Sequence, residues 1–421
     1  MRKEIGEGVN FTTIHDEKFK QNQLSISFIL PLREETASLN ALLPLVLKHG
    51  SSEYPDMTAL NKRLKELYGA RLDGSTNKRG NYQIITLFSE CLGDSYAFGG
   101  EKVLESCAGL LRSVIFDPAF ENGTFRKNDV EIEKRNLTDQ IDSILNDKRQ
   151  YALVKLKETM CKDEAYGIFE LGRREDVSGI TPGRLYEAWK SLLSTAEVEI
   201  ILVGPGDPRP VEKLFAESFE GIKRQYAKND SKDGIKKPEK VNTVVERLPI
   251  TQSKLVMGLR AGAAAPENTD AIHLATAILG GSPHSKLFAN VREKMSLCYY
   301  CMSYLERQKG IVFIDSGIEE SNYEKARGEI LNQLEELKAG NFSDDEMNFA
   351  KLYIQNSFMT VGDSLDSLTT YYLAQSVSGN IRSPEEAAEA LMNIKREQVT
   401  EAANGINLDT VYLLAGIKEG E

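Results

Sequence analysis

The sequence predicts an α+β fold with two similar domains, each a largely antiparallel sheet with helices packed on one side. Two observations indicate this. The order strand, two helices, two strands begins at residue 22 and recurs at residue 253. A polar, lysine-rich stretch at 223–240, KRQYAKNDSKDGIKKPEK, separates the two occurrences and is typical of an exposed linker. We therefore predict an internal duplication, with domains at 1–222 and 241–421 joined by this linker.

The first half is predicted to start its core with NQLSISFILPL at 22–32, whose alternating apolar residues indicate a strand with one buried face. Thr36 is expected to cap the helix that follows. Pro44 falls inside this helix, where it removes a backbone hydrogen bond. The strands ARLDGSTNKRG and NYQIITLFSECL come next, and EVEIILVGPG closes the half. Helices are expected at 36–48, 56–68, 96–115, 126–146, 149–162 and 181–193.

The second half repeats this order. It begins with the strand SKLVMGLRAGA at 253–263, continues with the helical segments TDAIHLATAILGG and SKLFANVREKM, and then has the strands LCYYCMSYLER and GIVFIDSGIEE. The last strand is TVYLLAGI. Helices are expected at 321–339, 343–360, 363–378 and 384–403. Hairpin strands followed by several helices favour an antiparallel sheet covered by a helical layer.

Composition excludes several functional classes. The 421 residues include 41% hydrophobic and 27% charged residues, as in soluble globular proteins. The net charge is −11 and no basic run stands out, which argues against nucleic acid and anionic membranes as partners. No stretch approaches the roughly 18 apolar residues of a membrane span, and MRKEIGEGVNF has no signal-peptide core. The five irregularly spaced cysteines are expected to be reduced thiols, which favours a cytoplasmic location.

The histidines do not predict a metal site. None of the four belongs to an H-x-x-x-H or H-E-x-x-H pair. His49 precedes Gly50 and is expected to end a helix rather than bind a metal with Glu53. His273 is expected to pack within a helix, and His284 lies in a loop after GGSP; His15 completes the set.

Cys298 and Cys301 form a lone C-x-x-C pair on a predicted strand. Because residues three apart on a regular strand point to opposite faces, this spacing predicts neither a zinc chelate nor a redox pair. No nucleophile elbow, Walker A motif or dinucleotide fingerprint is present.

The segment LFANVREKMSLCYY at 287–300 has two residues with chemical potential. Arg292, near a helix end, offers a fork of donors for a carboxylate or a peptide carbonyl. Tyr299, at the start of a strand, can donate a hydrogen bond to a developing oxyanion. Taken alone, the two residues are more simply interpreted as a surface salt bridge and a half-buried tyrosine, since such a pair is common on protein surfaces.

The wider segment AILGGSPHSKLFANVREKMSLCYY resembles the second domain of the pitrilysin/insulinase-like zinc metallopeptidases, the inverzincins. The resemblance extends over essentially the whole chain, including the duplicated halves, the linker and LLRSVIFDPAF at 110–120. The paired arginine and tyrosine of the family fall on Arg292 and Tyr299. The resemblance implies two domains that face each other as half a clamshell around a peptide.

The zinc motif of the family is missing from this chain. In active members a first-domain helix carries H-x-x-E-H, in which two histidines bind zinc and the glutamate is the general base. Registering LVLKHGS on the family pattern places the two histidine positions on Asn40 and Pro44 and the base on Leu43. The third ligand, a glutamate on a later helix, falls on Gln140. The resemblance therefore implies that this chain binds no zinc and is inactive alone.

The same resemblance implies a function. Some family members split the active site between a chain with the zinc motif and a chain that supplies the arginine and tyrosine. This chain resembles the second kind, a non-catalytic, substrate-binding subunit of a heterodimeric zinc metalloendopeptidase that acts on peptides. A zinc-motif paralogue would supply zinc and base, Arg292 would hold a peptide carbonyl or carboxylate, and Tyr299 would donate to the oxyanion.

Two alternatives remain at this point. One is a scaffold role without proteolysis, as in family relatives in respiratory complexes; the other is a stand-alone peptide-binding homodimer.

Strand alternation further predicts that Tyr299 and Cys301 share the face toward the peptide, while Cys298 and Tyr300 face the helices.

Overall fold

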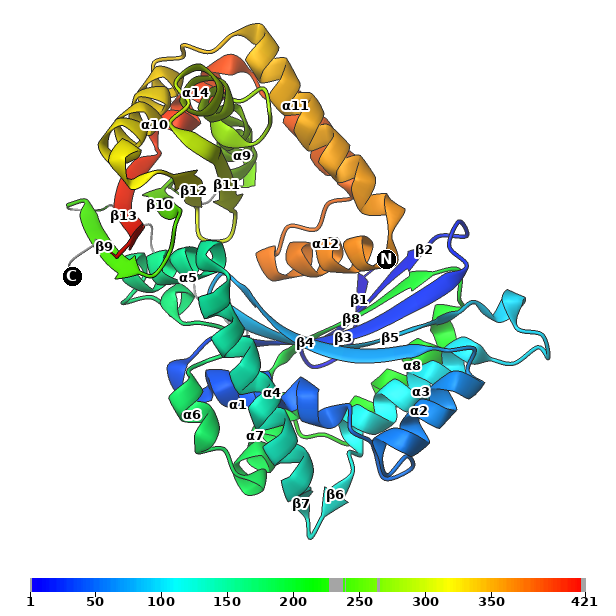
Figure 1. The fold of residues 1–421 in the computed structure, drawn as a ribbon. Coiled ribbons are helices and arrows are strands. Elements are labelled where there is room, and N and C mark those ends of the chain that lie inside the picture. Colours follow the sequence, from blue (N-terminus) through cyan, green and yellow to red (C-terminus); the bar gives the residue numbers. More distant parts are fainter. Residues whose placement is uncertain (1, 227–237, 239, 263–265, 418–421) are drawn as a thin grey trace. The chain divides into compact units, whose positions relative to one another are not determined.

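The computed structural model describes residues 2–226, 238, 240–262 and 266–417, so most of the predicted linker lies outside the described residues (Figure 1). The chain forms two compact units. Unit 1 comprises 1–143, 168–231 and 363–379, and unit 2 comprises 144–167, 232–362 and 380–421. Both units combine a sheet with packed helices, and the predicted α+β class is confirmed. Among the helices of the described ranges, none is long and apolar enough to cross a membrane.

The sheet of unit 1 has six strands in the order β1-β2-β8-β3-β5-β4. All neighbouring strands are antiparallel except β2 and β8, which are parallel. The strands are β1 Arg2–Gly6, β2 Val9–His15, β3 Gln21–Pro31, β4 Arg71–Arg79, β5 Tyr82–Leu92 and β8 Glu197–Gly204. A separate hairpin pairs β6 Phe120–Glu121 with β7 Thr124–Phe125.

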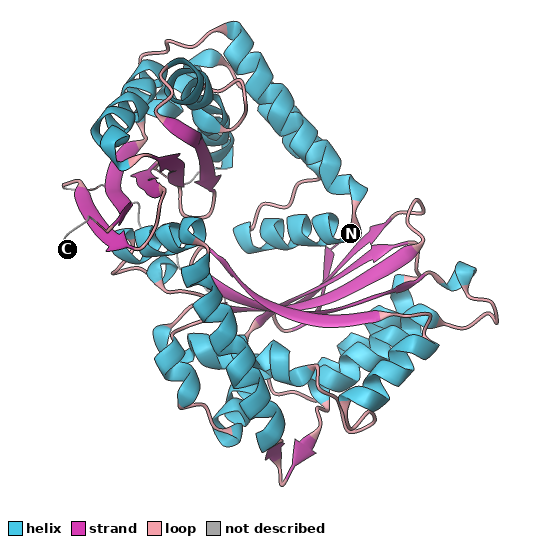
Figure 2. Ribbon diagram, in the orientation of Figure 1, coloured by secondary structure: helices cyan, strands magenta, loops and turns pink. Residues whose placement is uncertain are grey.

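The helices of unit 1 cover the apolar face of this sheet, where Leu24, Ile26 and Phe28 of β3 are buried (Figure 2). They are α1 Glu34–Leu47, α2 Met57–Glu66, α3 Val103–Phe116, α4 Lys127–Asn146, α6 Arg174–Ser178, α7 Pro182–Thr195 and α8 Pro208–Glu220. The opposite face of β3 is polar and is partly covered by α12 Leu365–Ser378, whose Thr369 Oγ1 donates to Gln23 Oε1 at 3.3 Å. A short 3₁₀ turn, Asp94–Tyr96, precedes α3.

Helix α1 shows why a proline is tolerated here. It begins at Glu34, and Arg33 rather than the predicted Thr36 occupies the N-cap position. Pro44 lies inside α1, and every residue from 40 to 47 is buried. Since most helical stability in proteins comes from tertiary packing, burial of this apolar run compensates for the missing backbone hydrogen bond.

The sheet of unit 2 has five strands in the order β11-β12-β10-β13-β9. The pairs are antiparallel except β13 and β9, which are parallel. The strands are β9 Asn242–Leu248, β10 Ser253–Arg260, β11 Cys298–Glu306, β12 Ile311–Ile318 and β13 Asn407–Gly416. The helices are α5 Lys148–Met160, α9 Pro266–Gly280, α10 Tyr323–Lys338, α11 Asp344–Met359, α13 Pro384–Met392 and α14 Arg396–Asn404, with the π-helical segment η3 Leu287–Lys294. The single helix predicted at 384–403 is thus two helices.

The predicted duplication is confirmed by topology. The sheet of unit 2, in the order β11-β12-β10-β13-β9, repeats the order β4-β5-β3-β8-β2 of unit 1. The parallel pair occupies the same place in both sheets, as β13 and β9 in unit 2 and as β8 and β2 in unit 1. One helix in each unit comes from the other half of the chain. Helix α5 packs its Leu156 and Met160 against Val256 and Phe313 of unit 2, while α12 lies on the sheet of unit 1. The contiguous domains 1–222 and 241–421 differ from the compact units by these exchanged helices.

Candidate functional site

The positions that correspond to the zinc motif are part of the packed interior of unit 1. The Asn40 side chain is 6% exposed and its Nδ2 donates to Gln83 Oε1 at 3.0 Å. Gln83 Nε2 in turn donates to the carbonyl oxygen of Ala37 at 2.9 Å. Leu43 is fully buried in the apolar core. The Asn40 amide therefore satisfies buried polar groups and is not directed at a vacant ligand site.

Pro44 and Gln140 complete this set. Pro44 packs on strand β4 at Gly74, where an added Cβ would lie 2.9 Å from the proline Cβ. The glycine thus permits the close approach of α1 to β4. Gln140 lies on the exposed side of α4, and its carbonyl oxygen accepts a hydrogen bond from Ser143. The four side chains offer no carboxylate, imidazole or thiolate, so they do not fit a zinc ion.

His49 has acidic partners, but these are on α4 and not at Glu53. Its Nε2 lies 2.6 Å from Glu133 Oε1, and its Nδ1 lies 3.6 Å from Asp129 Oδ1. Burial raises the pKa of Glu133, but hydrogen bonds from His49 and Asn136 outweigh it, so the net pKa is lowered. Across the part of the chain that the structure describes, no group of three or more His, Cys, Asp or Glu residues could hold a metal ion.

The other candidate histidines have structural surroundings. His273 is partly buried on α9 beside Arg307, and loss of hydration followed by the arginine charge lowers its pKa to about 3. A neutral imidazole at this position acts as a packed, hydrogen-bonded group, as the sequence predicts. The His284 ring stacks on Phe349 with 4.5 Å between centroids.

Arg292 is in the π-helical segment η3 of unit 2. A π-helical turn is uncommon and recurs at functional sites. The Arg292 side chain is 41% exposed, its guanidinium lies 4.6 Å from the Phe288 ring centroid, and its Nη1 is 3.6 Å from Glu293 Oε1. The chain then reverses at Ser296, which has a φ of 51°, a left-handed value unusual for a residue other than glycine.

Tyr299 is the most exposed aromatic side chain of β11, at 57%. Its hydroxyl donates to Glu319 Oε1 at 2.5 Å, and this hydrogen bond raises the pKa of the phenol. Tyr299 therefore stays protonated at neutral pH and is a hydrogen-bond donor on the surface of unit 2. The side chains of Arg292 and Tyr299 both reach solvent, in contrast to the buried Asn40 and Leu43.

The predicted alternation along β11 is wrong because the strand contains a bulge. Cys298 pairs with Ile318, but Tyr300 pairs with Gly317, so Tyr299 is an extra residue in the ladder. Relative to Cys298, every later side chain of β11 therefore points to the opposite face of the sheet from the one that regular alternation predicts. Cys298 and Cys301 therefore share one face, whereas the sequence predicted opposite faces.

Tyr300 accordingly lies on the face of unit 2 that α5 covers. Its hydroxyl donates to Asp315 Oδ1 at 3.1 Å, and the Arg149 guanidinium of α5 lies 4.7 Å from its ring centroid. Asp315 is fully buried and forms an ion pair with Arg149. This ion pair was not predicted from the sequence. An aspartate within the otherwise apolar run GIVFIDSGI was the signal, since a buried carboxylate needs a partner.

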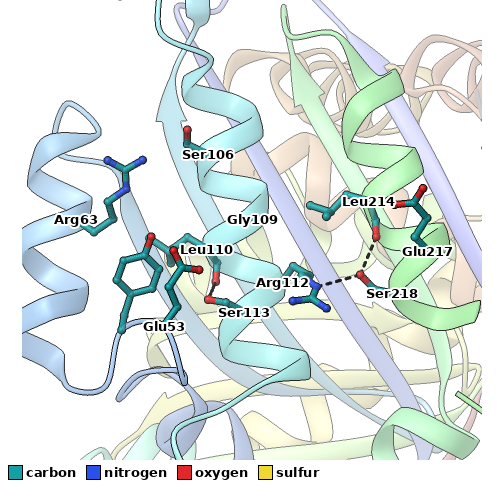
Figure 3. Close-up of a pocket in the computed structure, with 11 residues that line it drawn as sticks. Glu53, Arg63, Ser106, Gly109, Leu110, Arg112, Ser113, Leu214, Glu217 and Ser218 are labelled. Atoms are coloured by element: carbon teal, nitrogen blue, oxygen red, sulfur yellow. Dashed lines mark hydrogen bonds between the residues drawn. The ribbon is translucent and has the colours of Figure 1, made fainter. Parts of the chain in front are cut away.

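A separate groove opens in the helical layer of unit 1, between α2, α3 and α8 (Figure 3). Its volume is about 480 Å³, and Ser106, Gly109 and Ser113 of α3 contribute to its lining. Arg112 Nε donates to Ser218 Oγ at 3.3 Å across one side of it. None of the degenerate zinc positions, and neither Arg292 nor Tyr299, contributes to this groove.

Comparisons with known proteins agree with this picture. The family model described as "Peptidase M16 inactive domain" matches residues 179–353. A Bacillus subtilis protein named "Probable inactive metalloprotease YmfF" is 31% identical over 413 residues, which cover 97% of this chain and 96% of that protein.

Two solved structures are similar over nearly their full lengths. A conserved protein from Enterococcus faecalis has a TM-score of 0.90 and 26% identity, with 100% of this chain and 99% of that chain covered. A "peptidase M16 inactive domain" from Pseudomonas fluorescens has a TM-score of 0.80 and 17% identity, with 99% and 98% covered. The second likeness, at its low identity, concerns the fold alone.

Proposed function

Because the chain belongs to the M16 (pitrilysin/insulinase-like) metallopeptidase family as an inactive homologue, we propose that it is the non-catalytic, substrate-binding subunit of a heterodimeric zinc endopeptidase. A paralogue with the H-x-x-E-H motif would supply the zinc ion and the general base. This chain would bind the peptide and complete the site with Arg292 and Tyr299.

One observation carries the proposal: this chain lacks the zinc ligands and the base of the family's active site but has its arginine and tyrosine. The positions for zinc ligands and base are an amide, a leucine, a proline and an exposed glutamine. Arg292 and Tyr299 remain on the surface of unit 2, and within the described residues the ion pair of Arg292 is with its exposed neighbour Glu293. A buried structural ion pair would not leave the guanidinium accessible to a ligand.

The chemistry of the two side chains suits distinct steps. The Arg292 guanidinium can donate two parallel hydrogen bonds to a carboxylate, or one to a peptide carbonyl, already in the bound ground state. Tyr299, kept protonated, can donate to the oxyanion that forms when water adds to the scissile carbonyl. In the free protein the phenol donates to Glu319, and in the proposed reaction the oxyanion would replace this carboxylate as the acceptor.

The peptide itself would bind in extended form. Strands β4 and β11 are at the ends of their sheets, so each has one side without a neighbouring strand in the described chain. An extended peptide can add to such an edge through main-chain hydrogen bonds. The proposal concerns peptides with an accessible extended segment and does not require a folded recognition domain.

The proposal is tested by co-expression of this chain with a zinc-motif paralogue from the same source. We expect a stoichiometric complex that hydrolyses an unstructured peptide, whereas each purified chain alone is inactive. A stable complex without hydrolysis would overturn the proposal in favour of the scaffold role. A peptide-binding homodimer that ignores the paralogue would overturn it in favour of stand-alone binding.

A further inference from the structure

The bulge at Tyr299 brings two thiols onto one face of unit 2. Cys298 is opposite Ile318 and Cys301 is opposite Ser316 on β12. Ile318 and Ser316 are two residues apart on a regular strand, so they and their partners point to the same side. Three residue steps on β11 therefore span the length of two steps on β12.

This compression sets the separation of the two cysteines. Two strand steps of roughly 3.3 Å place their Cα atoms about 6.6 Å apart. A disulfide usually joins Cα atoms separated by about 4.4–6.8 Å and Cβ atoms separated by about 3.5–4.5 Å. The Cα separation therefore falls near the long end of the permitted range, and closing the bridge requires the two Cβ atoms to tilt toward each other. On a regular strand the separation would be roughly 10 Å, too long for a bridge. The bulge thus creates a geometry that the C-x-x-C spacing alone does not provide.

The surroundings give the two sulfurs different roles. Cys298 is partly exposed, whereas Cys301 is 4% exposed. The neighbouring Cys301 thiol lowers the pKa of Cys298, whereas the neighbouring Cys298 sulfur, followed by burial, raises the pKa of Cys301. The charge of Arg292 also favours the Cys298 thiolate. An accessible thiolate beside a protonated, buried thiol is the arrangement of an attacking and a resolving cysteine.

We propose that Cys298 and Cys301 form a thiol–disulfide exchange site that a small-molecule disulfide, such as oxidised glutathione, converts to an intramolecular disulfide. The Cys298 thiolate attacks one sulfur of the small disulfide, forms a mixed disulfide and releases one small thiolate. Cys301 then loses its proton to solvent, attacks the Cys298 sulfur and releases the second small thiolate. Two protein thiols are oxidised and one small disulfide is reduced to two thiols, so atoms and electrons balance.

The remaining cysteines are internal controls. The thiols of Cys91 and Cys107 also shift each other's pKa, but these two residues are 2% and 1% exposed in the core of unit 1. Cys161 is 1% exposed. Since a thiolate must be reached by the small disulfide before exchange begins, these three should remain reduced while the chain is folded. The inference goes beyond the proposed function, because it requires neither a partner chain nor a peptide.

The test uses the full chain equilibrated with mixtures of oxidised and reduced glutathione, then acid-quenched, denatured, alkylated and mapped by mass spectrometry. The number of alkylated thiols should fall from five to three, with the new disulfide in the peptide that contains Cys298 and Cys301. Excess reduced glutathione should restore all five thiols. Retention of five thiols in every mixture would overturn the proposal, as would a disulfide between Cys91 and Cys107.

Two variants separate the roles of the sulfurs. Cys301→Ser should trap Cys298 as a stable mixed disulfide with one glutathione, and Cys301→Ala should do the same if serine disturbs folding. Cys298→Ser should leave Cys301 unmodified. A mixed disulfide on Cys301 in Cys298→Ser, or none on Cys298 in both Cys301 variants, would refute the assigned order of attack.

Discussion

Replacement of Arg149 by methionine tests whether α5 is held on unit 2 by its ion pair with Asp315. Asp315 is fully buried, and it accepts hydrogen bonds from Arg149 Nε and from the Tyr300 hydroxyl. Methionine keeps the length and apolar contacts of the side chain beside Met302 but removes the charge. The carboxylate then loses its only ion-pair partner among the described residues, while the Tyr300 hydrogen bond remains.

The expected cost follows from burial. Removal of one partner of a buried ion pair typically costs about 3–5 kcal/mol. The Arg149 side chain is 40% exposed, so solvent screens part of its charge and we expect the low end, about 3 kcal/mol. For a unit of this size, that loss corresponds to a decrease in Tm of roughly 6–12 °C.

The pH dependence has a definite sign. Burial raises the pKa of Asp315, although Arg149 and Tyr300 oppose this, and the net pKa is raised. Loss of Arg149 raises it further. A carboxyl group with a raised folded-state pKa destabilises the fold as pH rises through that value and imposes no penalty below its unfolded pKa. The cost of Arg149→Met should therefore be largest near pH 7 and smaller near pH 4.

Equilibrium denaturation followed by far-UV circular dichroism measures this cost. The single tryptophan, Trp189, belongs to unit 1, so its fluorescence reports that unit separately. Asp315→Asn in the Arg149→Met background should recover stability, because no buried charge remains. Arg174→Met, which removes an exposed ion pair with Asp142, is the control and should change stability by less than about 0.5 kcal/mol. An Arg149→Met chain as stable as wild type at pH 7 would refute the reasoning.

Three further predictions concern other local features. Ser296→Gly should stabilise the chain by about 0.5–1 kcal/mol in thermal denaturation, since the left-handed φ of 51° strains serine but not glycine; a loss of stability would contradict this. Gly74→Ala should cost about 1–3 kcal/mol, because the new Cβ meets the buried ring of Pro44 at 2.9 Å, and an unchanged denaturation midpoint would exclude this contact. Glu133→Gln should cost about 1.5–3 kcal/mol at pH 7, since it weakens the hydrogen bond to His49. The lowered pKa of Glu133 makes its contribution disappear as pH falls through the folded-state value, so variant and wild type should converge in acid; a constant difference would contradict this.

The order of elements was readable from the sequence because most strands and helices carry their own pattern. The alternation in NQLSISFILPL predicted β3 within one residue at each end, and the apolar run of α1 predicted a helix despite Pro44. The strands β1, β2 and β9 were not predicted. The exchange of α5 and α12 was also not predicted, since it depends on contacts between residues far apart in the chain and not on local periodicity.

The candidate site was only partly readable for a similar reason. The resemblance located Arg292 and Tyr299, and both are accessible in the structure. The direction of the neighbouring side chains was wrong, because one extra residue in the β11 ladder reverses the alternation and nothing in CYYCMSY marks a bulge. Backbone register, not residue type, decides which of these groups lie together.

The most direct test of the central claim is the effect of Tyr299→Phe on peptide hydrolysis by the reconstituted heterodimer. The substitution removes only the hydroxyl, and the oxyanion exists only in the transition state, so kcat should fall by about 10²-fold with little change in KM. Tyr304→Phe on the same strand is the matched control, and Tyr300→Phe is less suitable because its hydroxyl supports Asp315. Arg292→Ala should also raise KM, since its contact precedes the reaction. Unchanged kcat in Tyr299→Phe, with the complex intact, would contradict a role for this chain in the reaction.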